Sequence, residues 1–308
     1  MATSGSSNVT LNLNEIIEES FERCGKELRS GYDFRTARRS INLLTIEWAN
    51  RGINLWTVEE GQIVMATGQG VYALPTDTID LLDQVIRQNA ASLNQQDINI
   101  SRISESTYST IPNKLTQGRP IQVWINRQSG MQNASSDVVS ATVYPTDTTI
   151  TLNSTADLGT TGFIQIDSEI IAYPNVSGNQ LLNCARGQNG TTAAQHNVSA
   201  AVTVLNLPCI NVWPTPNSPG NQYTFVYWRL RRMQNAGTGI NDQDIPFRLV
   251  PAMVAGLAYY LSMKLSDVDP NRAAALKADY EQQFDLAAQE DREKAPLRIV
   301  PRNTFYYR

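Results

Sequence analysis

Patterns that predict helices lie at the two ends of this chain, with strand patterns between them, and this distribution constrains the fold most strongly. Apolar residues recur three or four positions apart over residues 12–28 and 33–50, and again over 246–265 and 270–294. The short loop within each pair predicts antiparallel helical hairpins. The sequence therefore predicts an α+β fold, in which a split bundle of N- and C-terminal helical hairpins joins an antiparallel β region.

Local signals predict where these helices begin and end. Asn12 or Asn14 is a candidate N-cap of the first helix, because a short polar side chain can accept a bond from a free backbone N–H. Gly52 stands where a left-handed C-cap is expected after the second helix. Pro246 suits the first position of the third helix, and Asp269 is placed to cap the fourth.

The segment 137–207 differs in texture from the rest of the chain. It contains no Lys and one Arg, and no helical pattern. Its short, closely spaced strand patterns are typical of a small β-barrel or sandwich. They cover Ala141–Tyr144, Thr149–Leu152, Gly162–Ile166, Glu169–Tyr173, Gln180–Asn183 and Ala200–Leu205. Strong strand patterns flank the segment, so we predict a β module inserted into a sheet.

The chain thus divides into three predicted parts. Residues 1–136 and 208–295 form a core of helical bundle and β-sheet, and residues 137–207 form the inserted module. Residues 296–308 alternate apolar and basic side chains, contain no acid and end in aromatic residues. Two prolines prevent a continued helix there. We predict an extended C-terminal arm that adds to the surface of a partner.

Composition excludes several classes of protein. A net charge of −4 argues against a general nucleic-acid binder, which is usually basic. Residues 1–10 lack the pattern of a signal peptide, and no apolar run has the length of a membrane span. Cys24, Cys184 and Cys209 are far apart, and no CxxC pair occurs. We therefore expect reduced, half-buried thiols rather than a zinc site or a disulfide framework.

No convincing catalytic set is present. His196 is the single histidine, and no GxSxG, HExxH, Walker A or GxGxxG motif occurs. Carboxylate pairs could serve glycan hydrolysis, but an acidic chain of this length offers such pairs by chance. They are Glu59 with Glu60, Asp167 with Glu169, and Asp242 with Asp244. We predict no enzyme, no cofactor and no metal site, with His196 as a hydrogen-bonded turn residue.

Two further groups of side chains have alternative interpretations. Arg35, Arg38 and Arg39 lie close together at the start of the second predicted helix. They can be interpreted as a solvent-exposed face or as a contact between subunits. The aromatics of the strand Tyr223–Arg229 could stack on sugars or bases, although alternating positions are more typical of a core.

An ordered series of short stretches runs along the chain outside the module. It comprises Glu47–Trp56, Glu59–Gly61, Tyr72–Pro75, Gly118–Pro120, Tyr223–Trp228 and Ala255–Leu261. This order resembles the head-to-tail adaptor (connector) proteins of short-tailed bacteriophages, over roughly 12–136 and 208–294. Within the module, the stretch Gly162–Tyr173 followed by Ala185-Arg186-Gly187, Gly190-Thr191, Ala194 and His196 is similar to a β module of phage structural proteins. That likeness makes Arg186 and His196 structural, and Ser199 stands where a glycine is usual.

The resemblance implies a virion protein at the head–tail junction, assembled in the host bacterial cytoplasm. It would form a dodecameric ring that docks under the portal, extends the DNA channel and provides the platform for the tail nozzle. Its partners would be the portal protein, the nozzle protein, other copies of itself and, as a further candidate, tail fibres. Viral DNA would pass without sequence-specific binding, and no membrane is involved.

In this family the C-terminal arm grips the portal. The residues here that would do so are Arg298, Arg302, Phe305, Tyr306, Tyr307 and Arg308. An alternative stays open at this point: a receptor- or glycan-binding virion tail protein that uses the 137–207 module.

Overall fold

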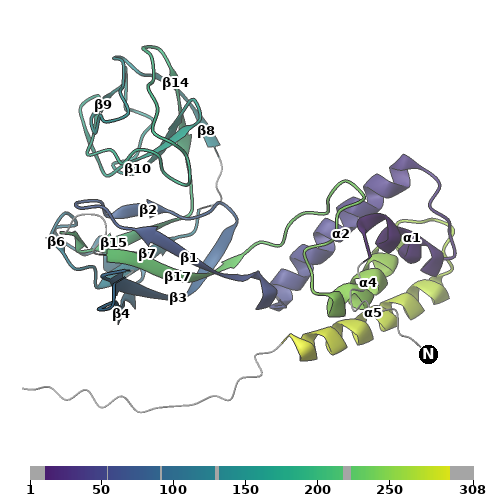
Figure 1. Ribbon diagram of the computed structural model, residues 1–308. Coiled ribbons are helices and arrows are strands. Elements are labelled where there is room, and N and C mark those ends of the chain that lie inside the picture. The colour runs from purple at the N-terminus through teal and green to yellow at the C-terminus, as the bar shows by residue number, and fades with distance from the viewer. Residues whose placement is uncertain (1–10, 54, 91, 129–131, 218–222, 292–308) are drawn as a thin grey trace, which may run out of the picture. The chain divides into compact units, whose positions relative to one another are not determined.

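The computed structural model describes residues 11–53, 55–90, 92–128, 132–217 and 223–291. The chain forms two compact units (Figure 1). The helical unit takes Met1–Thr57 and Met233–Arg308 from the two ends of the chain, and the β unit takes Val58–Arg232. Helices and mainly antiparallel sheets are both present, so the predicted α+β class is confirmed. No helix in the described residues is long and apolar enough to cross a bilayer.

Four main helices build the helical unit: α1 (Leu13–Arg23), α2 (Gly31–Arg51), α4 (Val250–Ser262) and α5 (Pro270–Glu290). Their ends follow the local signals. The Asn12 side chain accepts from the Glu15 amide, and the Asp269 side chain accepts from the Asn271 amide. Gly52 ends α2 with φ of 83°, a conformation that costs glycine little. The third helix differs from expectation, because a 3-10 turn, Phe247–Leu249, follows Pro246 and α4 begins only at Val250.

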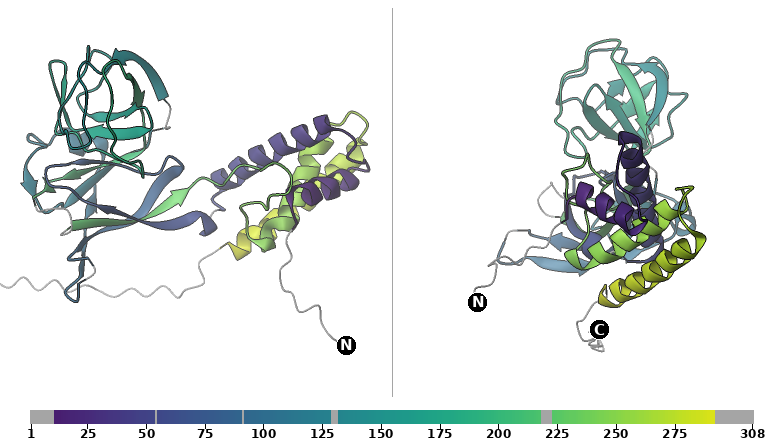
Figure 2. Two further views of the ribbon diagram at one scale, coloured as in Figure 1. Left: turned by 45° about the horizontal axis from the view of Figure 1, so that its top comes forward. Right: turned by 90° about the vertical axis from the view of Figure 1, so that its right-hand side faces the viewer.

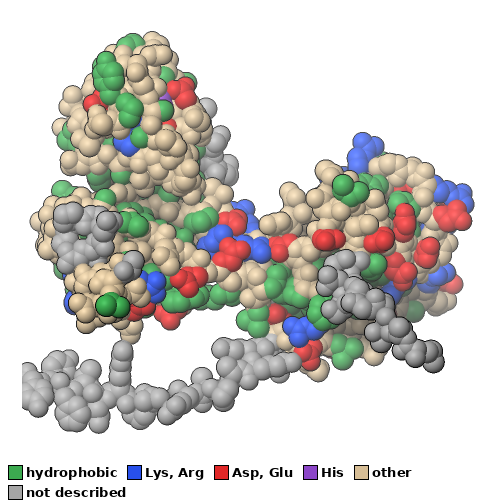
Figure 3. All heavy atoms as spheres, viewed as in Figure 1, with side chains coloured by type: hydrophobic (Ala, Val, Ile, Leu, Met, Phe, Trp, Pro, Cys, Tyr) green, Lys and Arg blue, Asp and Glu red, His purple; other side chains and the backbone are tan. Residues whose placement is uncertain are grey.

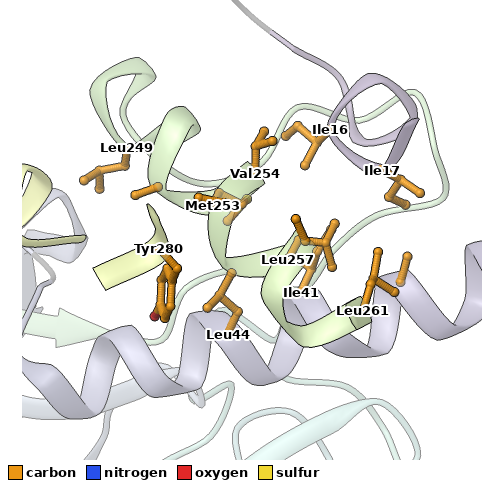
Figure 4. Close-up of a cluster of buried hydrophobic side chains, with 14 of the residues drawn as sticks. Ile16, Ile17, Ile41, Leu44, Leu249, Met253, Val254, Leu257, Leu261 and Tyr280 are labelled. Carbon is orange, nitrogen blue, oxygen red and sulfur yellow. The ribbon is translucent and has the colours of Figure 1, made fainter. Parts of the chain in front are cut away.

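Helix α4 is the centre of this unit. It packs against α1, α2 and α5, and both views of Figure 2 place it between α2 and α5. Figure 4 shows Ile41 and Leu44 of α2 directed toward Leu257 and Leu261 of α4. All four side chains are fully buried. Each burial contributes roughly 1.5–3 kcal/mol, and this shared core explains why the two ends of the chain fold together.

Two sheets form the main part of the β unit. The first has the order β1-β17-β3-β4 and the second β2-β15-β7-β5. In the first sheet these strands are β1 (Val58–Val64), β17 (Tyr223–Arg231), β3 (Thr78–Gln88) and β4 (Gln96–Asn99). In the second they are β2 (Val71–Ala73), β15 (Cys209–Trp213), β7 (Gln122–Asn126) and β5 (Ser101–Arg102). Inward-facing residues of both sheets, such as Phe225 and Ile210, share one core.

Short elements complete the β unit. Trp56 lies in a 3-10 turn, Leu55–Thr57, and β1 begins directly after it at Val58. The Ser-rich stretch after β5 forms the short helix α3 (Glu105–Ser109). A parallel two-residue pair joins β6 (Gln117–Gly118) to β16 (Thr215–Pro216).

The segment predicted as a module, together with the residues just before it, forms two small sheets. One has the order β11-β10-β14-β8, from β8 (Gln132–Val138), β10 (Gly162–Ile166), β11 (Glu169–Tyr173) and β14 (Ala201–Leu205). The other has the order β12-β13-β9, from β9 (Ile150–Thr151), β12 (Asn175–Ser177) and β13 (Gln180–Leu182). Ile164 and Leu181, one from each sheet, belong to one core. The described strands do not close into a barrel. Of the two predicted forms, barrel and sandwich, the sandwich therefore fits them.

Details of this segment also depart from the sequence pattern. The strand expected at Ala141–Tyr144 is reduced to an isolated bridge between Val143 and His196. Ser199, at the position where the predicted resemblance expects glycine, adopts φ of 69°, the left-handed region that glycine occupies without strain. The flanking strands β7 and β15 are direct antiparallel neighbours, with Asn126 opposite Cys209. The chain therefore leaves and re-enters the second sheet at one place.

Candidate assembly surfaces

The predicted arm residues Arg298, Arg302, Phe305, Tyr306, Tyr307 and Arg308 lie outside the described residues. The other predicted contact, the arginines of α2, is described. Arg35, Arg38 and Arg39 are all exposed and lie beside Tyr32, which is 65% exposed. Among the described residues, none of the three forms an ion pair; Arg39 donates to the Thr36 hydroxyl at 3.4 Å. We call Tyr32, Arg35, Arg38 and Arg39 the basic patch.

A further cation strengthens the positive potential of the basic patch. Lys264, just beyond the end of α4, donates from Nζ to the Ser40 hydroxyl at 2.7 Å. Burial lowers the pKa of Lys264, and the positive charge of Arg39 lowers it further. Arg39, Lys264 and Leu43 line the same shallow groove, of about 500 Å³. Like charges held this close favour an anionic partner.

The outer face of α2 is also apolar. Leu43 is 53% exposed and Ile46 is 57% exposed. They follow Tyr32 and Arg39 at helical spacing, on a side of α2 other than the buried stripe that includes Ile41 and Leu44. The core of the helical unit buries one apolar side of α2. The second apolar side stays exposed, which is typical of a surface that binds a partner.

Opposite charge lies at the other end of α4. Glu15, Glu18, Glu19 and Glu22 stand at positions i, i+3, i+4 and i+7 of α1, which lie on one side of a helix, and acidic side chains gather over α1 in Figure 3. They border a groove of about 470 Å³. Its apolar lining includes Leu11, Val250, Pro251, Val254 and Phe247, which is 67% exposed. We call this groove, with its glutamates, the acidic groove.

Only part of this acidic charge is neutralised within the unit. Arg23 pairs with Glu19 at 3.0 Å and with Asp279 of α5 at 3.1 Å. Glu18 and Glu22 are exposed and form no ion pair with any described residue. The sequence patterns did not lead us to predict the acidic groove, although the helical spacing of four glutamates was a visible signal.

The predicted turn histidine lies in a buried polar cluster. His196 Nδ1 is 2.7 Å from Asp167 Oδ2, and Nε2 is 2.8 Å from Glu169 Oε2. Arg186 donates to both oxygens of Glu169, and also to the carbonyls of Tyr144 and Ala194. Burial alone would raise the pKa of Glu169, but bonds from Arg186, the Ala194 amide, His196 and the Gly187 amide lower it to about 2.

This cluster has the residue types of a catalytic site but not its accessibility. Glu169 is completely buried and His196 is 1% exposed, so neither meets a substrate. Both Glu169 oxygens already accept bonds from the protein. Sequence analysis named Asp167, Glu169 and His196 separately, and folding joins them across 27 to 29 positions. These hydrogen bonds and ion pairs hold β11 to its neighbouring loops, and we call the cluster of Asp167, Glu169, Arg186 and His196 the clasp.

The remaining chemical candidates also have structural partners. Glu59 binds Arg229 and Arg231, and Asp244 accepts from the Gln234 amide. Tyr223 and Tyr227 are buried in the core between the two sheets. Within the described ranges, no group of three or more His, Cys, Asp or Glu residues could hold a metal ion. The three cysteines are free and buried, more deeply than the half-burial expected from sequence.

Comparison with known families gives one match. The family model described as SU10 adaptor protein matches residues 118–300, more than half of the chain. The matched region begins at β6 and includes the segment 137–207, β17, α4 and α5. No curated protein matches the sequence.

Proposed function

The chain belongs to the SU10 adaptor protein family, and from this premise we propose that it forms the head-to-tail adaptor ring of a short-tailed bacteriophage. The family makes it a phage structural adaptor and a virion component rather than an enzyme. The finer proposal is that the ring docks under the portal, extends the DNA channel and provides the platform for the tail nozzle. The observation that carries it is the family match over the segment 137–207 and both closing helices.

The C-terminal arm is our proposed contact with the portal. It follows α5, so it is attached to the helical unit. Three arginines can bind portal carboxylates through paired hydrogen bonds, and three terminal aromatics can fill pockets. Many arms in one ring bind together, so each can be weak while the ring holds firmly.

The charge of the chain suits a channel for DNA. A surface with a net charge of −4 repels the phosphate backbone weakly and offers no general basic site on which it would stall. This supports passage of DNA without sequence-specific binding. The glycan-binding alternative receives no support, because Tyr223, Tyr227 and Glu169, its best candidates, are buried.

Co-assembly with the portal ring tests this function. The full-length chain and a version ending at Ala295 are each mixed with purified portal ring and imaged by electron microscopy. We expect an added ring below the portal with the full-length chain alone. If both versions dock, the adaptor function stands and the arm is not the contact. If neither docks, the proposed function is wrong.

A charge-matched variant separates the arm from general electrostatics. Arg298→Ala, Arg302→Ala and Arg308→Ala together should prevent docking if the arm binds portal carboxylates. The control replaces three exposed cations elsewhere, Lys114→Ala, Arg119→Ala and Arg127→Ala, and should dock normally. Equal loss in both variants would contradict a specific role for the arm.

A further inference from the structure

We propose that the acidic groove of one copy receives the basic patch of a second copy, so that the chain associates head to tail through its helical unit. This inference rests on the proposed adaptor function only in that both involve assembly; it names the two surfaces that make the contact. The partner is a second copy of this chain because both complementary surfaces are present on one unit.

The two surfaces carry opposite charges. The basic patch and Lys264 offer cations that form no ion pair with described residues, and the acidic groove offers the unpaired carboxylates of Glu18 and Glu22. No ion pair joins these charges within the described residues of one copy. Between copies they can pair, and arginine binds carboxylates with two parallel hydrogen bonds. Exposed complementary charge also speeds and orients the encounter.

Both surfaces also expose apolar side chains. The acidic groove has Phe247 at its rim and Val250 and Pro251 along its wall. The opposing face of α2 presents Tyr32 and, further along, Leu43 and Ile46, each more than half exposed. Aromatic side chains surrounded by charged groups are typical of the residues that contribute most to binding at an interface.

The two surfaces lie toward different ends of α4. Leu261, Lys264 and Leu265 line the groove beside the basic patch, whereas Phe247, Val250 and Val254 line the acidic groove. The stretch of α4 from Val254 to Leu261 spans about 10 Å. Two different patches on one unit make a heterologous contact, which leads to a closed ring or an open filament rather than a two-fold dimer.

Charge reversal tests this contact on the full-length chain, alone and on the portal ring. Arg35→Glu, Arg38→Glu and Arg39→Glu place acids against acids, and should weaken self-association about tenfold or more at low salt. Glu18→Arg with Glu22→Arg should do the same from the other side. A chain that carries all five changes restores opposite charges, and should associate again. Oligomers are measured by sedimentation and by native mass spectrometry.

A matched control keeps the change in net charge and moves it elsewhere. Lys114→Glu, Arg119→Glu and Arg127→Glu replace exposed cations of the β unit and should leave association at the wild-type level. The inference is overturned if the α2 reversal associates like the wild type, if the five-change chain stays dissociated, or if the wild type forms no oligomer with or without the portal.

The outcomes also separate this inference from the proposed function. If the wild type associates in a charge-dependent way but never docks on a portal, the head-to-tail contact stands and the adaptor function fails. If the chain docks on the portal and the reversal variants form the same ring, the adaptor function stands and the contact proposed here fails.

Discussion

Arg186 and Glu169 form a two-bond ion pair that is withdrawn from solvent. Arg186 Nε donates to Oε1 and Nη2 donates to Oε2, each at 2.8 Å. The arginine side chain is 8% exposed and the glutamate 0%. The pair is tied to His196 and to two backbone amides, so charge and hydrogen bonds help to fix the loops after β11 to the strand.

Removing the glutamate charge should destabilise this clasp strongly. Glu169→Gln leaves the buried Arg186 without its counter-charge, and a buried pair broken on one side costs about 3–5 kcal/mol. We expect faster hydrogen exchange in β10 and β11, with the helical unit unaffected. Asp157→Asn, at an exposed carboxylate of the same segment, is the control and should change little. Equal exchange in the two variants would contradict a stabilising role for Glu169.

The same carboxylate predicts a loss of stability in acid. Its pKa is lowered from an ordinary 4.5 to about 2 in the folded chain, so the folded state holds the ionised form more strongly than the unfolded state does. The stabilisation is complete above pH 4.5 and is lost as the pH falls toward 2. Hydrogen exchange of β11 against pH should show this loss in the wild type. In Glu169→Gln, the hydrogen exchange of β11 should change less over the same pH range. A pH dependence equal to that of the wild type would rule out this link between protonation and stability.

A close helix crossing should be sensitive to one methyl group. A Cβ on Gly256 of α4 would come within 2.9 Å of Leu44 of α2 and of Tyr280 of α5. Gly256→Ala therefore overpacks the helical core, and we expect it to lower the free energy of unfolding by about 1–3 kcal/mol. Gly31→Ala meets no atom within 4 Å and serves as the control. The two variants are compared by thermal unfolding, followed by the circular dichroism of the helices. Similar melting temperatures would contradict the close packing at Gly256.

The cysteines should resist modification while the chain is folded. Burial raises the pKa of Cys24 to about 11 and those of Cys184 and Cys209 to about 12. The reactive thiolate is therefore scarce at pH 8. We expect Ellman's reagent to detect no rapid thiol in buffer and all three in denaturant. A fast-reacting thiol in buffer would show that one of these sites opens.

The helical unit was largely predictable because its signals are local. The caps at Asn12, Gly52 and Asp269 act within four residues, and the apolar stripes of the helices repeat every three or four. The late start of α4 was not predictable from Pro246, because a proline at a helix start fits a 3-10 turn equally well.

The sheets and the clasp were less predictable because they depend on distant partners. Strand patterns predicted a sheet on both sides of the segment 137–207, but they could not show that β7 pairs with β15 while β17 lies between β1 and β3. Nothing in the local sequence joins Asp167 and Glu169 to His196. The Arg35–Arg39 contact stays a prediction, now with a candidate counterpart that only the folded arrangement of α1 and α4 revealed.

The pairing of Asn126 with Cys209 has a practical consequence. Partners across an antiparallel pair lie about 4.5–5.5 Å apart, a gap that a tight turn or a whole foreign domain can span equally well. The stretch between them can therefore differ in length from one phage to another without disturbing the register on either side. The same pair of strand ends offers a site at which an antigen or a fluorescent label can be inserted for display.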